Sequence, residues 1–292
     1  MSTRRRLWRL GFLLCLLASA ACFVLAARRV AANRSAEAAY AALRADVSQQ
    51  DDAAEAPAPT AGPTLEEVLA APFEGIVDAD ETKLPADLYT GLTDSPIDFD
   101  RLRALNPELI AWITIPGTQI DYPVARHEGD DQTYYLSRDL YGSPQFAGCI
   151  FMQDVNAADF SDPVTVLYGH NMTNGSMFQN LYFYLTEPDF LKTSPFVTVR
   201  TAERVLVYEV ISAYCADDLN LMLTRDFTDP DVFSAYLDEC LHPRSLEAVV
   251  RDGVFLDADA RLLTLSTCRA GRPDTRLLVQ AVLVYEKEVS DP

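Results

Sequence analysis

From about residue 98 onward, the chain alternates short runs of β-branched, aromatic and aliphatic residues with clusters of turn residues. Runs this short and this rich in Val, Ile, Thr and Tyr predict β-strands. Because few helical stretches separate them, the pattern favours an antiparallel barrel or sandwich over a doubly wound α/β sheet. The predicted strands span residues 112–115, 119–124, 149–152, 164–168, 196–199, 204–214, 261–267 and 276–285.

Two pairs of these strands are expected to form hairpins. The strands at 196–199 and 204–214 are joined by a short turn, and the last two strands are joined by a seven-residue loop. Pro123 lies in the second predicted strand and has no N–H to donate. We therefore expect that strand at a sheet edge, or the proline at a strand end.

Helical spacing of apolar residues interrupts the strands at 230–242. Asp229 can cap this helix and Pro230 suits its first turn. Its apolar face, which is expected to pack on the core, consists of Val232, Phe233, Tyr236, Leu237, Cys240 and Leu241. Shorter helices are predicted at 98–105, ending before Asn106-Pro107, and at 177–184.

The first 29 residues have the pattern of a membrane anchor. An uncharged stretch from Leu10 to Ala27 would span about 27 Å as a helix, enough for a thin bilayer core. Four arginines precede the stretch and two follow it, so the N-terminus is expected in the cytoplasm. Signal-peptidase cleavage after Ala20, or lipoprotein processing at Cys22, are the alternatives, and each of the three exports the body.

The remaining chain divides by composition. The predicted divisions are a cytoplasmic tail and transmembrane anchor at 1–29, an extracellular spacer at 30–63, an N-terminal extension at 64–97 and a catalytic domain at 98–292. Proline and acidic residues predict that the second half of the spacer, residues 46–63, is disordered. The first half is Ala-rich and fits either helix or coil. A capping-box pattern at Thr64 to Glu67 predicts a helix at the start of the extension.

The charge distribution excludes one class of function. The net charge is −19, yet residues 1–44 hold eight arginines and one acidic residue, which leaves −26 on the rest. A basic head on an acidic body fits a membrane anchor followed by an exported domain. Phosphate would be repelled by such a body, so a nucleic-acid partner is not expected.

Cysteine and histidine spacing gives no metal motif. The six cysteines form no C-x-x-C pair and the chain has three histidines, so no zinc site and no cofactor is expected. Cys149, Cys215 and Cys240 are interpreted as small buried hydrophobic residues. Spacing alone leaves their disulfide pairing open.

Three residues that follow or begin predicted strands could support acyl transfer. His170 follows the strand at 164–168, Cys268 ends the strand at 261–267, and Arg276 begins the last strand. A cysteine thiolate is a nucleophile, an imidazole can carry its proton to a leaving amine, and a guanidinium can hold an oxyanion. If the last two strands form a hairpin, Arg276 faces Cys268. His127 in a polar loop and His242 at a helix end are given structural roles.

Several strings resemble class B sortases, the cysteine transpeptidases of Gram-positive bacteria. Residues 106–118 and 120–124 are similar to the start of that family's domain, and 134–136 and 147–151 fit it as well. The chemistry-bearing strings are Tyr168-Gly169-His170-Asn171-Met172 followed by Gly175-Ser176-Met177-Phe178, Thr264-Leu265-Ser266-Thr267-Cys268, and Arg276-Leu277-Leu278-Val279-Gln280-Ala281. The chain departs from the family pattern at Cys149, where Ser is common, and at Gln280, where His is frequent.

The resemblance covers roughly residues 98–286 and implies a closed eight-stranded barrel with an N-terminal helical extension and an added helix before the cysteine strand. It implies Cys268 as nucleophile, His170 as acid/base partner and Arg276 as charge stabiliser, with Arg272 as a weaker candidate for the arginine role. Thr267 is expected either to contact substrate or to be a strand residue with a paired hydroxyl.

The implied reaction cleaves a C-terminal sorting motif of a secreted protein through a thioester and transfers the acyl group to an amine, usually of the peptidoglycan cross-bridge. A pilin lysine as acceptor is one alternative, and a hydrolytic cysteine protease is another. The order His, Cys, Arg disfavours a papain-type protease, in which the Cys precedes the His. A non-enzymatic surface adhesin would not need the three residues together.

Overall fold

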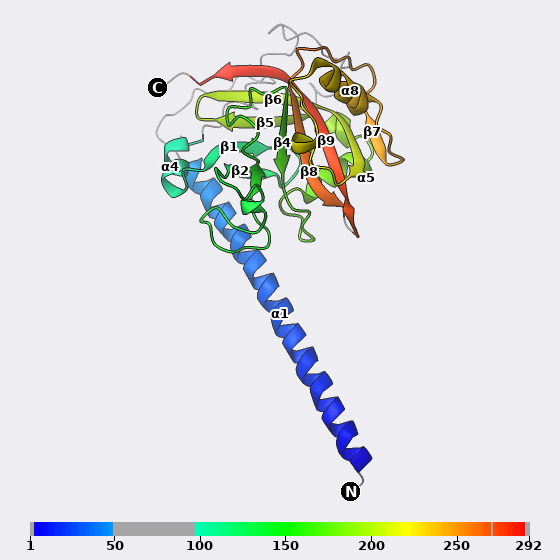
Figure 1. Ribbon diagram of the computed structural model, residues 1–292. Helices are drawn as coiled ribbons and strands as arrows, with labels where there is room; N and C mark the ends of the chain where they lie inside the picture. The colour runs from blue at the N-terminus through cyan, green and yellow to red at the C-terminus, as the bar shows by residue number, and fades with distance from the viewer. Residues whose placement is uncertain (1–2, 49–96, 270, 290–292) are drawn as a thin grey trace.

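The eight expected strands form a closed barrel at one end of a long helix (Figure 1). The computed structural model describes residues 3–48, 97–269 and 271–289. The barrel order is β5-β1-β2-β3-β4-β8-β9-β6, closed by pairing of β6 with β5, and β7 adds outside β6. The strands are β1 (Leu109–Thr114), β2 (Asp121–Arg126), β3 (Ile150–Met152), β4 (Val164–Tyr168), β5 (Phe196–Thr201), β6 (Arg204–Asp217), β7 (Ala248–Val250), β8 (Leu262–Arg269) and β9 (Arg272–Glu288). The predicted closed eight-stranded barrel is confirmed.

The strand directions differ from the antiparallel arrangement that the strand pattern favoured. The pairs β2–β3 and β4–β8 are parallel, so the sheet is mixed. A parallel pair needs a crossover connection rather than a tight turn. The long connections at 127–149 and 169–261 supply those crossovers, and the sequence pattern gave no signal for which strands they would join.

Two local expectations are corrected by the strand register. The strand β2 lies between β1 and β3 rather than at an edge, but β3 pairs with it only from Val124 onward. Pro123 is thus just outside that ladder, where a missing N–H costs no hydrogen bond. The β8–β9 hairpin is also tighter than a seven-residue loop, because β8 continues to Arg269 and β9 begins at Arg272.

The helices begin and end largely at the expected signals. Asp98 caps α4 by accepting a hydrogen bond from the Arg101 N–H (2.8 Å), and Asp229 caps α8 by accepting from the Asp231 N–H (2.9 Å). Among the described residues after α1, the helices are α4 (Phe99–Leu105), η2 (Tyr134–Leu136), η3 (Gln179–Tyr182), α5 (Phe183–Thr186), α6 (Phe190–Thr193), α7 (Leu221–Thr224) and α8 (Pro230–Leu241). The helix before the cysteine strand is therefore present.

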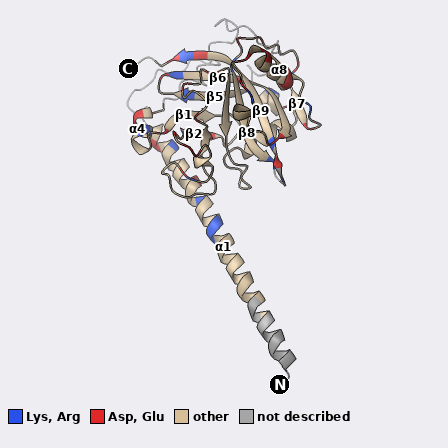
Figure 2. Cartoon of the chain, in the orientation of Figure 1, with Lys and Arg blue, Asp and Glu red and all other residues tan. Residues whose placement is uncertain are grey.

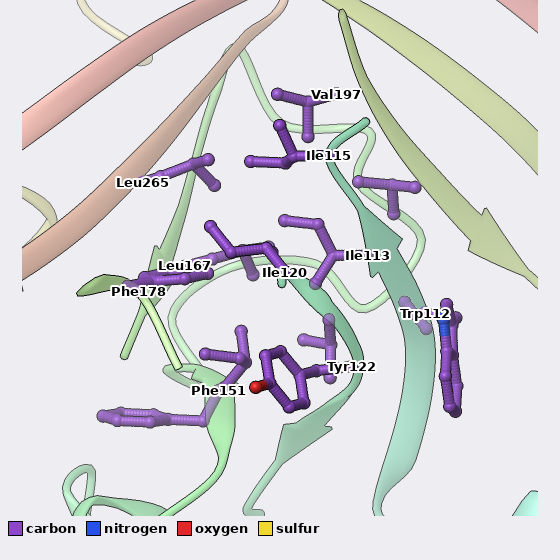
Figure 3. Close-up of a cluster of buried hydrophobic side chains, with 14 of the residues drawn as sticks. Trp112, Ile113, Ile115, Ile120, Tyr122, Phe151, Leu167, Phe178, Val197 and Leu265 are labelled. Carbon is purple, nitrogen blue, oxygen red and sulfur yellow. The ribbon is translucent and has the colours of Figure 1, made fainter. Parts of the chain in front are cut away.

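The barrel interior is a continuous apolar core. Figure 3 shows side chains of β1, β4 and β8 directed at one another, among them Ile113, Leu167 and Leu265, with Phe178 beside them. All four are fully buried. Trp112 lies on the other side of β1, as alternation along a strand requires, and its indole N–H donates to Asp121 (2.7 Å).

A second cluster lies on the outer face of β4, β8, β9 and β6. Helix α8 packs there on a mainly apolar surface. Beneath it, Gln280 donates to the hydroxyls of Tyr214 and Tyr236 (both 3.0 Å) and accepts from Thr264 (2.7 Å). The same face continues toward the β8–β9 hairpin, where Cys268 and Arg276 are only partly buried.

The N-terminal helix α1 (Thr3–Val47) is continuous over 45 residues and joins the barrel through its C-terminal turns. Tyr40, Leu43 and Val47 are buried in the barrel's core cluster. The part of the predicted spacer that the structure describes is thus helix rather than coil. The capping box at Thr64 and nearly all of the predicted extension lie outside the described residues.

Away from the barrel, α1 is apolar and exposed. Coloured by charge, the described part of the helix that extends from the barrel is mostly tan, with a band of basic residues (Figure 2). Within the described part of the chain, α1 is the one helix long and apolar enough to cross a bilayer, over Cys15–Val47. Large apolar side chains of this helix, such as Phe12, Leu17 and Phe23, are 65–76% exposed.

Candidate active site

Strand register brings the three residues predicted to carry the chemistry to one end of the barrel. In the parallel pair β4–β8, Tyr168 lies opposite Ser266, and the Gly169 N–H continues the ladder to the Ser266 carbonyl (3.2 Å). His170 and Cys268 each follow this pair by two residues, His170 just past the end of β4 and Cys268 still within β8, so both lie at the same end of the barrel. In β8–β9, Cys268 is the register partner of Arg276.

Arg276 contacts the thiol directly. Its Nη1 donates to the Cys268 Sγ at 3.1 Å, and its Nη2 donates to Asp218 at 2.6 Å. Asp218 immediately follows β6, so a neighbouring element of the barrel orients the guanidinium. Arg272, the weaker candidate for the arginine role, is exposed at the hairpin tip, where it pairs in register with Arg269. The guanidinium that reaches the sulfur is that of Arg276.

The imidazole of His170 is held by a segment distant in sequence. Its Nε2 is 2.8 Å from the Leu136 carbonyl oxygen, and its ring stacks on Phe146 with centroids 5.3 Å apart. A carbonyl can only accept, so Nε2 carries a proton and Nδ1 is left to gain or lose one. Burial lowers the pKa of His170 from its ordinary value, and the charge of Arg276 lowers it further. A neutral ring is therefore favoured at neutral pH.

Close packing explains the glycine before His170. A Cβ on Gly169 would lie 2.5 Å from Ile150 and 2.8 Å from the Phe178 ring. The strand exit can approach this wall only without a side chain. A residue other than glycine would push the histidine away from the end of β8.

Two residues not singled out beforehand hold the backbone of the cysteine. Asn171 donates from Nδ2 to the Cys268 carbonyl (3.0 Å), and the Tyr182 hydroxyl donates to the same oxygen (3.3 Å). Asn171 could have been found from its place beside His170 in the family string. Tyr182 on η3 lies 86 residues from Cys268, and no sequence signal joins the two.

Thr267 is not in a position to touch a substrate on the outer face. It is 2% exposed, and its hydroxyl donates to the Gly169 carbonyl (2.7 Å). Successive strand residues point to opposite faces, so a neighbour of the outward-facing Cys268 must point inward. Of the two expectations for Thr267, the structure favours the strand residue with a paired hydroxyl, which ties β8 to the histidine segment.

The other histidines and cysteines have structural surroundings. His127 stacks on Tyr134 (4.0 Å between centroids) and pairs with Glu108 (2.8 Å), so it is more firmly held than the loop position indicated. His242 caps α8 and pairs with Asp238. All six cysteines are free: Cys149 and Cys240 are buried, as expected, whereas Cys215 is only partly buried.

Comparison with known proteins agrees with this geometry. A family model described as the sortase domain matches residues 113–284. Sortase B of Listeria monocytogenes is 31% identical over 63% of this chain and 72% of its own length, and sortase B of Staphylococcus aureus is 27% identical over 64% and 74%. The X-ray structure of Clostridium perfringens sortase B superposes with a TM-score of 0.57 at 29% identity, over 64% of this chain and all of that one.

The family match spans more than half of the chain, and it includes the strands that carry the cysteine, the histidine and the arginine. The chain belongs to the sortase family, in its class B, and is a cysteine transpeptidase.

Proposed function

We propose that Cys268 is the nucleophile of this transpeptidase, His170 its acid/base partner and Arg276 its charge stabiliser. The observation that carries this assignment is the contact of the Arg276 guanidinium with the Cys268 sulfur, on paired strands, at the level where the histidine strand ends. Of the six cysteines, Cys268 is the one that this arrangement equips for nucleophilic attack.

In the first half of the reaction, the Cys268 sulfur attacks a backbone carbonyl of the substrate. A carbon–sulfur bond forms as the carbonyl becomes a tetrahedral oxyanion, and a guanidinium beside the sulfur lies where it can stabilise that negative charge. The carbon–nitrogen bond then breaks. The thiol proton passes to the departing amine through Nδ1 of His170, because Nε2 is occupied by the Leu136 carbonyl.

In the second half, an acceptor amine attacks the thioester. A new amide bond forms, the carbon–sulfur bond breaks, and the amine proton returns to the Cys268–His170 pair. The lowered pKa of His170 suits this step, since a neutral imidazole can accept that proton. We propose a sorting motif of a secreted protein as the acyl donor and a peptidoglycan cross-bridge amine as the acceptor, which anchors the protein to the wall. A pilin lysine would undergo the same chemistry.

We further propose that α1 anchors the enzyme in the cell membrane as a single span, with the barrel outside. The supporting observation is the exposed apolar surface of the helix before Arg28, since water would leave such a surface unstable. The uncharged stretch from Leu10 to Ala27 matches the bilayer core, and the four arginines before it favour a cytoplasmic N-terminus.

The assignment is tested with the full chain in detergent micelles, a panel of sorting-motif peptides, and amine acceptors of both kinds. Mass spectrometry should find cleavage and a new amide, both lost in Cys268→Ala and kept in Cys215→Ala, which removes the partly exposed cysteine of β6. Product formation by Cys268→Ala, or a thioester trapped on another cysteine, would refute it. The acceptor that is incorporated distinguishes wall anchoring from pilin polymerisation.

A further inference from the structure

His170 receives its side-chain contacts from residues 134–149, which we term the clamp loop. The Leu136 carbonyl accepts from its Nε2, and the Phe146 ring lies nearly parallel to the imidazole, at 19°. The contacts come from the two ends of the loop, ten residues apart. The orientation of the imidazole therefore depends on the shape of the clamp loop more than on the end of β4.

The clamp loop is closed on itself by backbone hydrogen bonds. The Gln145 N–H donates to the Ser137 carbonyl (2.9 Å), and the Cys149 N–H donates to the Tyr135 carbonyl (2.9 Å). These bonds bring Leu136 and Phe146 to the same place. A displacement of one side of the loop would therefore move both contacts to the histidine together.

The loop is also fastened to α1. The Arg29 guanidinium lies 3.6 Å from the centroid of the Phe146 ring. Gln145 donates to the Ala32 carbonyl of α1 (3.0 Å), and the Tyr40 hydroxyl contacts the Gly148 carbonyl (3.1 Å) and the Cys149 sulfur (3.3 Å). Three successive regions of the helix thus hold the side of the loop that carries Phe146.

Phe146 has no evident role in the core. Its side chain is 48% exposed, and it is not part of either core cluster. An exposed aromatic ring placed between a cation and an imidazole is held by stacking and cation–π attraction rather than by burial. Such an arrangement constrains a neighbour more than it stabilises the fold.

We propose that Phe146 is a positioning residue for His170 and that Arg29 of α1 holds Phe146 in place, which makes the helix next to the membrane anchor a part of the active-site architecture. The inference rests on the proposed role of His170. It goes beyond that role, because it links the histidine to α1, the helix of the proposed membrane anchor. Arg29, the residue that makes the link, is two residues past Ala27, where the apolar stretch ends.

The charges around His170 and the stacked Phe146 ring predict how the pKa of His170 changes when the stack is altered. Burial lowers the pKa of His170, and the charges of Arg276 on β9 and Arg29 on α1 both lower it as well, whereas the Leu136 carbonyl raises it. Removal of the Phe146 ring exposes the imidazole to water, and removal of Arg29 takes away a positive charge. Each change must therefore raise the pKa of His170.

The test uses the full chain in lipid nanodiscs with isotope-labelled histidine, so that NMR titration reports the pKa of His170, assigned with His170→Gln. We expect Phe146→Ala to raise that pKa by about half a unit or more and to lower kcat about tenfold while KM stays within twofold. Phe146→Tyr should restore both values. Arg29→Ala should shift the pKa in the same direction by less.

Tyr141→Ala is the matched control, since Tyr141 is a more exposed aromatic residue of the same loop. The inference is overturned if Phe146→Ala and Tyr141→Ala give the same pKa of His170 and the same kcat, or if Arg29→Ala leaves the pKa unchanged. The titration needs no substrate. It therefore tests the stack even if no peptide is turned over, which would count against the proposed function instead.

Discussion

The outer face of β8 and β9 has a half that α8 covers and a half that it leaves open, and polar residues serve different purposes in the two. On the outer face of β8 and β9, the half beneath α8 contains Thr264 and Gln280, whose polar atoms bond to each other and to buried tyrosines. The half beyond α8 contains Cys268 and Arg276, whose groups face one another at a partly exposed strand end. Polar residues that α8 covers stabilise the fold, whereas polar residues that it leaves uncovered are available for chemistry.

The physical reason is the cost of desolvation. A buried polar group must find protein partners, because an unpaired one costs about 1–3 kcal/mol. The covered half meets this requirement with hydrogen bonds that join Thr264, Gln280, Tyr214 and Tyr236. At the open half, the guanidinium is shared between a thiol and the Asp218 carboxylate, and water can enter where a substrate would bind.

The largest effect is expected in the open half. Arg276→Ala should lower kcat/KM about 100-fold or more, since loss of one donor to an oxyanion has effects of this size. The melting temperature should change little, because the side chain is partly exposed. Steady-state kinetics and thermal denaturation check both expectations.

Arg272→Ala is the control for that experiment, because Arg272 was the competing arginine in the sequence and is exposed at the hairpin tip. It should keep activity near that of the unmodified chain. Equal losses in the two variants would show that the hairpin needs positive charge in general and not a guanidinium at the sulfur.

The next effect concerns the covered half. Tyr236→Phe removes a hydroxyl that contacts both Thr264 and Gln280 beneath α8. We expect destabilisation of about 1–3 kcal/mol, which corresponds to a fall of about 3–10 °C in melting temperature for a domain of this size. The turnover of the folded protein should be unchanged. Calorimetry and kinetics below the transition measure the two quantities.

Tyr141→Phe, which removes a hydroxyl from an exposed ring, serves as the matched control and should leave the melting temperature unchanged. If Tyr236→Phe instead lowered turnover without lowering stability, the division between a structural half and a chemical half would be wrong.

The smallest effect is expected at the ion pair that orients the arginine. Asp218→Asn weakens the contact with Arg276 Nη2, and exposed pairs of this kind contribute at most about 1 kcal/mol, so kcat/KM should fall roughly threefold to fivefold. Added salt should reduce the difference from the unmodified chain. Asp217→Asn is the neighbouring control, and an equal loss there would indicate a general effect of surface charge.

Much of this protein could be predicted from its sequence. The strands around Cys268, His170 and Arg276 were predicted from short runs of β-branched, aromatic and aliphatic residues and from the turn residues between them, because those signals are local in the chain. The cap at Asp229 was predicted for the same reason, and α8 followed from apolar spacing. The family strings identified the same three residues, and the pairing of β4, β8 and β9 brings them to one end of the barrel.

Other features were decided only by the tertiary structure. The parallel pairing of β4 with β8 brings His170 to the same end of the barrel as Cys268, and pairing across 98 residues leaves no periodic trace in the sequence. The inward direction of Thr267, the bond of Tyr182 to the Cys268 carbonyl, and the meeting of Arg29 with Phe146 likewise depend on which surfaces come together. Local patterns determine which elements form, whereas contacts between distant elements depend on packing, which a single sequence does not encode in any short segment.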